Sequence, residues 1–238
     1  MTLIDDYLAE QEKFENKYGK NTIVLMQVGH FYEAYGVDNE FEKSNGENMS
    51  KLADIMNIQM TRKNKSIVEN NRHNPLMIGV NIYSIDKYIQ ILLNANYTIV
   101  LISQTSEPPY VKREVTNIFS PGTNIEYNSK GNTNNLVSIY IEKIKNNILF
   151  VGASSIDLST GKNVVFETHS EANDKNYAYD ELFRFIQVYD PKELIIVKKN
   201  LEDTSDEKLS NYLELNNRVV HFKKDNQIQS SYFNISYQ

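Results

Sequence analysis

Two short apolar runs constrain the fold of this chain more than any other feature of its sequence. Residues 22–28 (TIVLMQV) and 97–104 (YTIVLISQ) are rich in β-branched and apolar side chains, as expected of buried strands. Amphipathic helical spacing accompanies them over residues 3–18 and 84–94, and Gly29 ends the first run just before the segment HFYEAYG. Strands that alternate with helices predict an α/β domain with a mixed sheet.

A change of composition near the middle of the chain predicts a second domain. The turn Ser120-Pro121-Gly122-Thr123 is followed by the polar stretch NIEYNSKGNTNN. We therefore expect a first domain at 1–123, a linker at 124–135 and a second domain at 136–238. The second domain shows strands at 136–144, 147–158 and 162–168, a helix at 178–189, a strand at 193–197, a helix at 206–215 and a strand at 218–222. That order is typical of a ribonuclease-H-like domain.

The charge balance limits the classes of function. The net charge is −6, whereas affinity for duplex DNA comes mainly from Lys and Arg that neutralise phosphates. Any DNA contact must then come from a local patch. The absence of cysteine excludes disulfides and thiolate metal sites. Without an apolar run of the roughly 20 residues that span a bilayer, we expect a soluble intracellular protein with no membrane partner, in the nucleus, the cytoplasm, a DNA-containing organelle or a viral factory.

The motifs of common enzymes are missing. The nine glycines never fall at the spacing of a phosphate-binding P-loop or of a dinucleotide fingerprint. Zinc-protease and hydrolase-elbow motifs are absent too. The carboxylates that a two-metal nuclease would use are Glu142, Asp157 and either Asp180 or Glu181. Glu142 alternates with isoleucines as a solvated residue does, and Asp157 precedes a Ser-Thr-Gly turn that a carboxylate commonly organises. We therefore predict no catalytic residue and no metal ligand.

Six segments, taken in order, resemble the MutS family of DNA mismatch-repair proteins. GHFYEAYG at 29–36 resembles the family's Gly-Asp-Phe-Tyr-Glu segment, and VKREVTNIFSPGT at 111–123 resembles the stretch that closes its first domain. Similar matches occur at 57–63 (NIQMTRK), 77–80 (MIGV), 97–104 and 152–161 (GASSIDLSTG). The resemblance spans nearly the whole chain. His30, Asn81 and Tyr83 replace the family's usual Asp, Pro and His, so the chain is a divergent member.

The resemblance implies a fold and a binding site. The fold is a MutS-like N-terminal domain followed by a ribonuclease-H-like connector domain. Phe31 would enter the minor groove as an aromatic wedge and stack on a mispaired base, while Glu33 would hydrogen-bond the displaced base and Tyr32 would pack inward. Basic side chains that could contact the DNA backbone are Arg62, Lys63, Lys65 and Arg72.

The resemblance also implies partners. They are mismatched double-stranded DNA, a MutS-like dimer partner and a MutL-like protein. Clamp and ATPase domains, with their ATP and Mg²⁺, would lie outside this chain, which by itself would be no enzyme and would hold no cofactor. Two alternatives remain open at this stage. One is an interaction module that docks repair partners through residues 124–238 without binding DNA, and the other is a metal-dependent nuclease.

Overall fold

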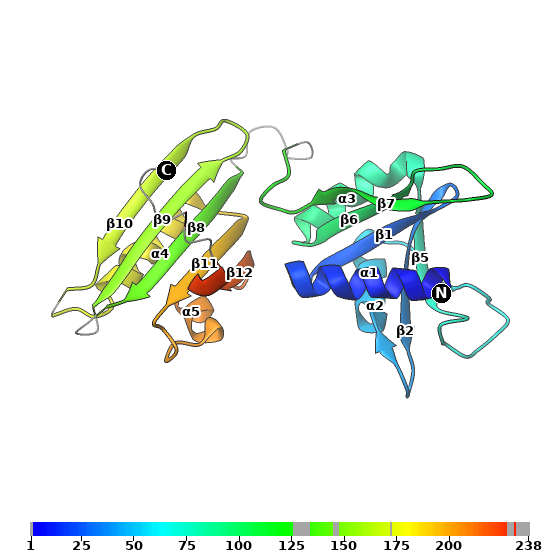
Figure 1. The fold of residues 1–238 in the computed structure, drawn as a ribbon, viewed down its shortest axis with the longest axis horizontal. Helices are drawn as coiled ribbons and strands as arrows, with labels where there is room; N and C mark the ends of the chain where they lie inside the picture. The colour runs from blue at the N-terminus through cyan, green and yellow to red at the C-terminus, as the bar shows by residue number, and fades with distance from the viewer. Residues whose placement is uncertain (1, 126–133, 145–147, 172, 228–230, 232–238) are drawn as a thin grey trace. The chain divides into compact units, whose positions relative to one another are not determined.

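The chain divides between Pro121 and Gly122 into two units, Met1–Pro121 and Gly122–Gln238 (Figure 1). The computed structural model describes residues 2–125, 134–144, 148–171, 173–227 and 231. Most of the predicted linker, 126–133, lies outside these residues. Each unit has its own sheet.

The first unit is built on a mixed sheet with the strand order β4-β5-β2-β1-β6-β7, and β3 pairs with β2. Strands β1 and β6 run parallel, and the other neighbours run antiparallel. In chain order the elements are α1 (Leu3–Tyr18), β1 (Thr22–Val28), β2 (Phe31–Asp38), β3 (Lys43–Ser44), α2 (Gly46–Met56), β4 (Thr61–Arg62), β5 (Leu76–Asn81), η1 (Ile82–Ser84), α3 (Ile85–Asn94), β6 (Thr98–Gln104) and β7 (Arg113–Phe119).

Helices cover both faces of this sheet. The ring of Tyr35 on β2 packs edge-on against Tyr7 of α1, with centroids 5.2 Å apart. The next residue, Gly36, faces Met49 of α2. Because successive strand residues point to opposite faces, α1 lies on one side of the sheet, and α2, which contacts α3, lies on the other (Figure 1). This explains why β1 and β6 are apolar at successive positions, as the sequence predicted.

Two local features differ from the sequence prediction. Residues 31–38 form strand β2, although the sequence indicated only an aromatic segment beyond the end of a strand. The strand was hard to recognise because its central residues are buried on both faces, which removes the polar alternation. The helix predicted from residue 84 begins at Ile85, and the hydroxyl of Ser84 donates to the carbonyl of Asn81 and does not cap the helix.

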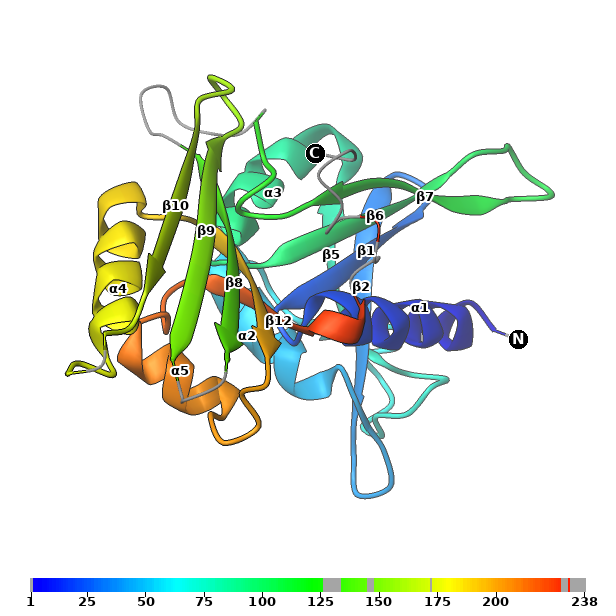
Figure 2. The same ribbon diagram turned by 60° about the vertical axis from the view of Figure 1, so that its left-hand side comes forward.

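The second unit is a five-stranded sheet with helices on one face. Its elements are β8 (Asn135–Lys143), β9 (Leu149–Asp157), β10 (Asn163–His169), α4 (Tyr177–Tyr189), β11 (Glu193–Lys199), α5 (Asp206–Tyr212), β12 (Val219–Lys224) and η3 (Asp225–Gln227). The strand order is β10-β9-β8-β11-β12, antiparallel among the first three and parallel from β8 to β12. Leu182 of α4 and Leu209 of α5 share one apolar core with Ile139 of β8, and Figure 2 shows α4 beside the strands.

The start of the second unit is held by a buried carboxylate. The backbone N–H of Gly122 donates to Glu193 Oε2 at 3.0 Å, and His221 lies 2.6 Å from Oε1 of the same side chain. A Cβ at position 122 would lie 2.4 Å from the Cβ of Glu193, so only glycine fits there. The Asn134 amide donates to the carbonyls of Gly122 and Asn124, both at 2.9 Å. Residues at both ends of the predicted linker are thus packed into the second unit.

The length and hydropathy of the helices show whether any of them could cross a membrane. None of those in the described ranges combines the length and the hydropathy needed to cross a membrane.

Gly36→Ala is expected to destabilise the first unit. Its Cβ would lie 2.6 Å from Met49 Cγ and 2.9 Å from the Asn45 carbonyl oxygen, so α2 must shift. Overpacking of this kind costs about 1–3 kcal/mol of unfolding free energy, measurable by urea denaturation.

The matched control is Gly79→Ala in the neighbouring strand β5, where the added Cβ would make only ordinary contacts, the closest at 3.4 Å from Glu33 Cγ. Equal unfolding free energies for the two variants would contradict the proposed packing of α2 on β2.

Candidate functional site

A two-residue turn presents Phe31. Val28 of β1 pairs directly with Phe31 of β2, so only Gly29 and His30 connect the strands. Gly29 has φ +60°, a conformation that glycine adopts without strain and that tight hairpins require at this position. Since β2 is flanked by β1 and β5, the hairpin is rigid. Even so, 47% of Phe31 remains exposed.

Strand alternation separates the aromatic neighbours of Phe31. Phe31, Glu33 and Tyr35 lie on the face covered by α1, and Tyr32 lies on the face covered by α2. The hydroxyl of Tyr32 shares a hydrogen bond of 2.7 Å with Ser103 on β6, and Ser103 shares another of 2.7 Å with Thr116 on β7. Tyr32 is therefore anchored within the sheet, and Phe31 points the other way.

Glu33 is held from one side. The buried hydroxyl of Tyr35 donates to Glu33 Oε2. Burial, and then the hydrogen bond to Glu33, raise the pKa of Tyr35, so the phenol keeps its proton. Gly79 pairs with Glu33 across β5, and the Cγ of Glu33 lies 3.4 Å from the place where a Cβ of residue 79 would stand. Glu33 is partly exposed, and residue 79 has no side chain that would cover it.

A polar network supports the turn from below. Arg113 Nε of β7 donates to the carbonyl of Gln27 at 2.9 Å, and the N–H of Gln104 donates to Gln27 Oε1 at 2.9 Å. The amide of Gln27 donates in turn to the carbonyl of Gly29 at 3.1 Å. No sequence motif marks this network. Its only signal was the arginine in the 111–119 segment, next to the strand that ends at Gln104.

The predicted backbone-contacting residues are not gathered around Phe31. Along β5, Asn81 pairs with Phe31 and Leu76 pairs with Arg62, a separation of five residues, or roughly 17 Å. Arg62 donates to the carbonyls of Ile67 and Val68, which holds its own loop. Lys63 and Lys65 are exposed.

Arg72 is neutralised by two carboxylates. It donates to Asp5 Oδ1 of α1 at 2.9 Å and to Glu42 Oε1 at 3.0 Å. The hydrogen bond from Arg72 lowers the pKa of Glu42. Arg72 therefore ties its loop to α1, and a phosphate would have to displace two acids to reach it.

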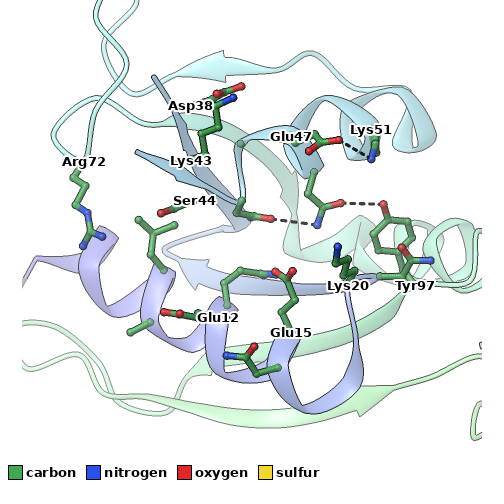
Figure 3. A pocket seen from close by; sticks show the side chains of 18 of the residues that line it. Glu12, Glu15, Lys20, Asp38, Lys43, Ser44, Glu47, Lys51, Arg72 and Tyr97 are labelled. Atoms are coloured by element: carbon green, nitrogen blue, oxygen red, sulfur yellow. Dashed lines mark hydrogen bonds and ion pairs between the residues drawn. The ribbon is translucent and has the colours of Figure 1, made fainter. Parts of the chain in front are cut away.

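A polar hollow of about 1150 Å³ lies elsewhere in the first unit (Figure 3). The charged side chains that line it are mixed in sign: Asp5, Glu12, Glu15, Lys20, Asp38, Lys43, Glu47, Lys51 and Arg72. Several of these charges are paired, such as Lys51 with Glu47 at 3.3 Å. Neither Phe31 nor Glu33 lines the hollow. It therefore contributes nothing to the site formed by the hairpin.

Each candidate carboxylate of the second unit contacts a neighbouring side chain. Asp157 accepts hydrogen bonds from the hydroxyls of Ser159 at 2.6 Å and Thr160 at 2.9 Å, which organises the turn as predicted. Glu142 pairs with Lys199 at 3.0 Å, and Asp180 accepts from the Tyr212 hydroxyl at 2.5 Å. In the parts of the chain that the structure describes, no three potential metal ligands come together.

Comparison with known proteins identifies relatives over most of the chain. Residues 11–128 match the family model of MutS domain I. A mutS homolog of Acanthamoeba polyphaga mimivirus is 34% identical over 230 residues, covering 93% of this chain and 20% of that protein. DNA mismatch repair protein MutS of Thermodesulfovibrio yellowstonii is 30% identical over 88% of this chain and 21% of its own length. MutS of Halothermothrix orenii is 28% identical over 98% and 23%. The chain thus spans about a fifth of the relatives it matches.

The role of Asp157 predicts a pH dependence. Hydrogen bonds from Ser159 and Thr160 lower the pKa of Asp157 to about 2, below the usual value of about 3.9 for an unfolded chain. Its contribution to stability is then complete above that usual value and is lost as the pH falls through about 2. Asp157→Asn should therefore lower the melting temperature at pH 7 but hardly at pH 2.

This prediction is checked by thermal unfolding at several pH values, with Glu202→Gln, at an exposed position of the same unit, as the control. A constant difference between Asp157→Asn and the parent from pH 7 to pH 2 would contradict it.

Proposed function

This chain belongs to the MutS family, and from that premise we propose that its first unit recognises mismatched DNA by inserting Phe31 as a wedge. The observation that carries the proposal is the placement of Phe31. A half-exposed aromatic ring stands at the tip of a two-residue hairpin whose strands lie in the middle of the sheet. The family match covers this hairpin.

A wedge suits a target that has no fixed sequence. A mispaired step is poorly stacked and easily bent, so it is distinguished by the energy needed to deform it. An apolar ring that enters from the minor groove unstacks a base step at a cost of a few kcal/mol, and the cost is lower where pairing is already disturbed. The rigid hairpin keeps the ring from folding back when it meets a well-stacked duplex.

Glu33 provides the second element of discrimination. It lies two residues beyond Phe31 on the same face of β2, and among the described residues only its Oε2 has a hydrogen-bond partner. Such a carboxylate accepts a hydrogen bond from a displaced base. On ordinary DNA the phosphates repel this carboxylate, and no displaced base compensates. The carboxylate therefore disfavours matched DNA as well as favouring mismatched DNA.

Affinity for the DNA backbone must come mainly from elsewhere. The chain carries a net charge of −6, and Arg62 and Arg72 are engaged with other residues of the chain. Lys63 and Lys65 are exposed candidates for phosphate contact. We therefore propose a sensor that acts beside other DNA-holding parts, with a MutS-like dimer partner and a MutL-like protein. ATP and Mg²⁺ would act outside this chain, because its sequence contains no P-loop.

For the second unit we propose a connector with a ribonuclease-H-like fold. Support comes from the strand order β10-β9-β8-β11-β12. The first three strands pair antiparallel, and β11 pairs parallel with both β8 and β12. The carboxylates considered for a nuclease, among them Glu142 and Asp157, are engaged in an ion pair and a turn. We propose a structural role for this unit, with no catalysis by this chain.

Phe31→Ala is expected to remove the preference for mismatched over matched duplex. Loss of one base-stacking ring lowers affinity for the mismatch on the order of tenfold and leaves weak binding to matched DNA unchanged. The measurement is fluorescence anisotropy at fixed salt on the whole protein that carries this chain, with duplexes that differ at one base pair.

The matched control is Phe41→Ala, at a ring that is 96% exposed in the β2–β3 turn, remote from the wedge hairpin. If Phe31→Ala kept the parental preference, the wedge would be excluded, and docking of repair partners without DNA recognition would take its place.

A further inference from the structure

We propose that Tyr35 is a positioning residue for Glu33, which it holds in the orientation that reads the displaced base. The inference rests on the proposed function, since it assigns a role to a residue beneath the same site. Tyr35 touches no DNA in this proposal. It acts only through the carboxylate two residues before it on the same face of β2.

The hydrogen bond between Tyr35 and Glu33 has a fixed donor and a fixed acceptor. The Tyr35 hydroxyl donates to Glu33 Oε2, and an ionised carboxylate can only accept. Since burial raises the pKa of Tyr35 above its ordinary value of about 10, the donor is present at neutral pH. Hydrogen bonds to a charged acceptor are the stronger kind. The bond therefore restrains a flexible side chain that would otherwise sample many rotamers at the surface.

Tyr35 is itself fixed from several directions. Only 3% of it is exposed, and its ring packs edge-on at 81° against Tyr7 of α1. Tyr7 is fully buried and donates its hydroxyl to the carbonyl of Val24 at 3.0 Å. The side chain of Asn45 donates to the backbone carbonyl of Tyr35 at 2.9 Å. The hydroxyl therefore has no freedom to follow Glu33, and Glu33 must adapt to it.

One carboxylate oxygen remains available. Oε2 is occupied by Tyr35, whereas Oε1 lies on the side of Gly79, which has no side chain to cover it. A carboxylate held by one oxygen presents the other in a defined direction, which reduces the entropy lost on binding. The two oxygens of Glu33 thus have different roles in this proposal. Oε2 is held by Tyr35 and fixes the orientation of the carboxylate, and Oε1 meets the displaced base.

Tyr32 offers a matched comparison. It is also a tyrosine of β2 with a hydrogen-bonded hydroxyl, but it lies on the opposite face, where its partner is Ser103. Tyr35→Phe and Tyr32→Phe each remove one hydroxyl from the same strand and preserve the ring. If the hydroxyl of Tyr35 merely stabilised the fold, both variants would lower the free energy of unfolding and neither would change the mismatch preference.

The experiment is a double-mutant cycle on the whole protein that carries this chain. The ratio of the dissociation constants for matched and mismatched duplex is measured for the parent, Tyr35→Phe, Glu33→Ala and the double variant, with Phe31→Ala and Tyr32→Phe as references. Loss of a hydrogen bond to a charged group changes such a ratio by about tenfold. We expect that fall for Tyr35→Phe, no fall for Tyr32→Phe, and no further effect of Tyr35→Phe once Glu33 is alanine.

Three results would overturn the inference. If Tyr35→Phe keeps the parental ratio while Phe31→Ala loses it, Tyr35 does not position Glu33, but the wedge stands. If Tyr35→Phe lowers the ratio equally with and without the carboxylate, it acts through the fold and not through Glu33. If Phe31→Ala also keeps the parental ratio, the proposed function itself fails. Urea denaturation of each variant separates these results from loss of folded protein.

Discussion

Only Gly29 and His30 connect β1 to β2, and this short connection sets the register on which the candidate site depends. With Val28 opposite Phe31, strand alternation sends Phe31 to the α1 face and Tyr32 to the α2 face. A slip of one residue would exchange the two faces of β2 and bury Phe31. The two-residue turn with the positive φ of Gly29 therefore determines which aromatic ring of β2 lies on the α1 face and stays half-exposed.

The net charge of the chain and the contacts of its arginines bear on how the proposed DNA recognition would work. In the proposed function, a detector that must release ordinary DNA gains from weak affinity for the DNA backbone, and the net charge of −6 fits that proposal. In the structure, Arg62 donates to a backbone carbonyl of its own loop, and Arg72 pairs with two carboxylates. Arg113, closer to the hairpin along the sheet, is committed to the backbone of Gln27. All three arginines of this unit, Arg62, Arg72 and Arg113, thus contact other residues of the chain.

In the second unit, acidic side chains make different contacts according to their surroundings. Glu193 is buried, where it accepts from the N–H of Gly122 and contacts His221, and it fixes the point at which the chain enters this unit. Asp157 closes a turn after β9. Carboxylates that might have converged on metals are distributed along the sheet instead, each with its own partner.

The sequence by itself determined the buried strands β1 and β6, the amphipathic helices and the family resemblance, because these follow from short-range patterns of polarity and from collinear motifs. It also indicated the turn around Asp157. Only the tertiary structure decided that β2 continues from the hairpin and pairs with β5, that Tyr35 donates to Glu33, and that Arg72 is held by Asp5. These features depend on register and on contacts between residues far apart in the chain or buried on both faces, and local patterns do not specify which surfaces meet.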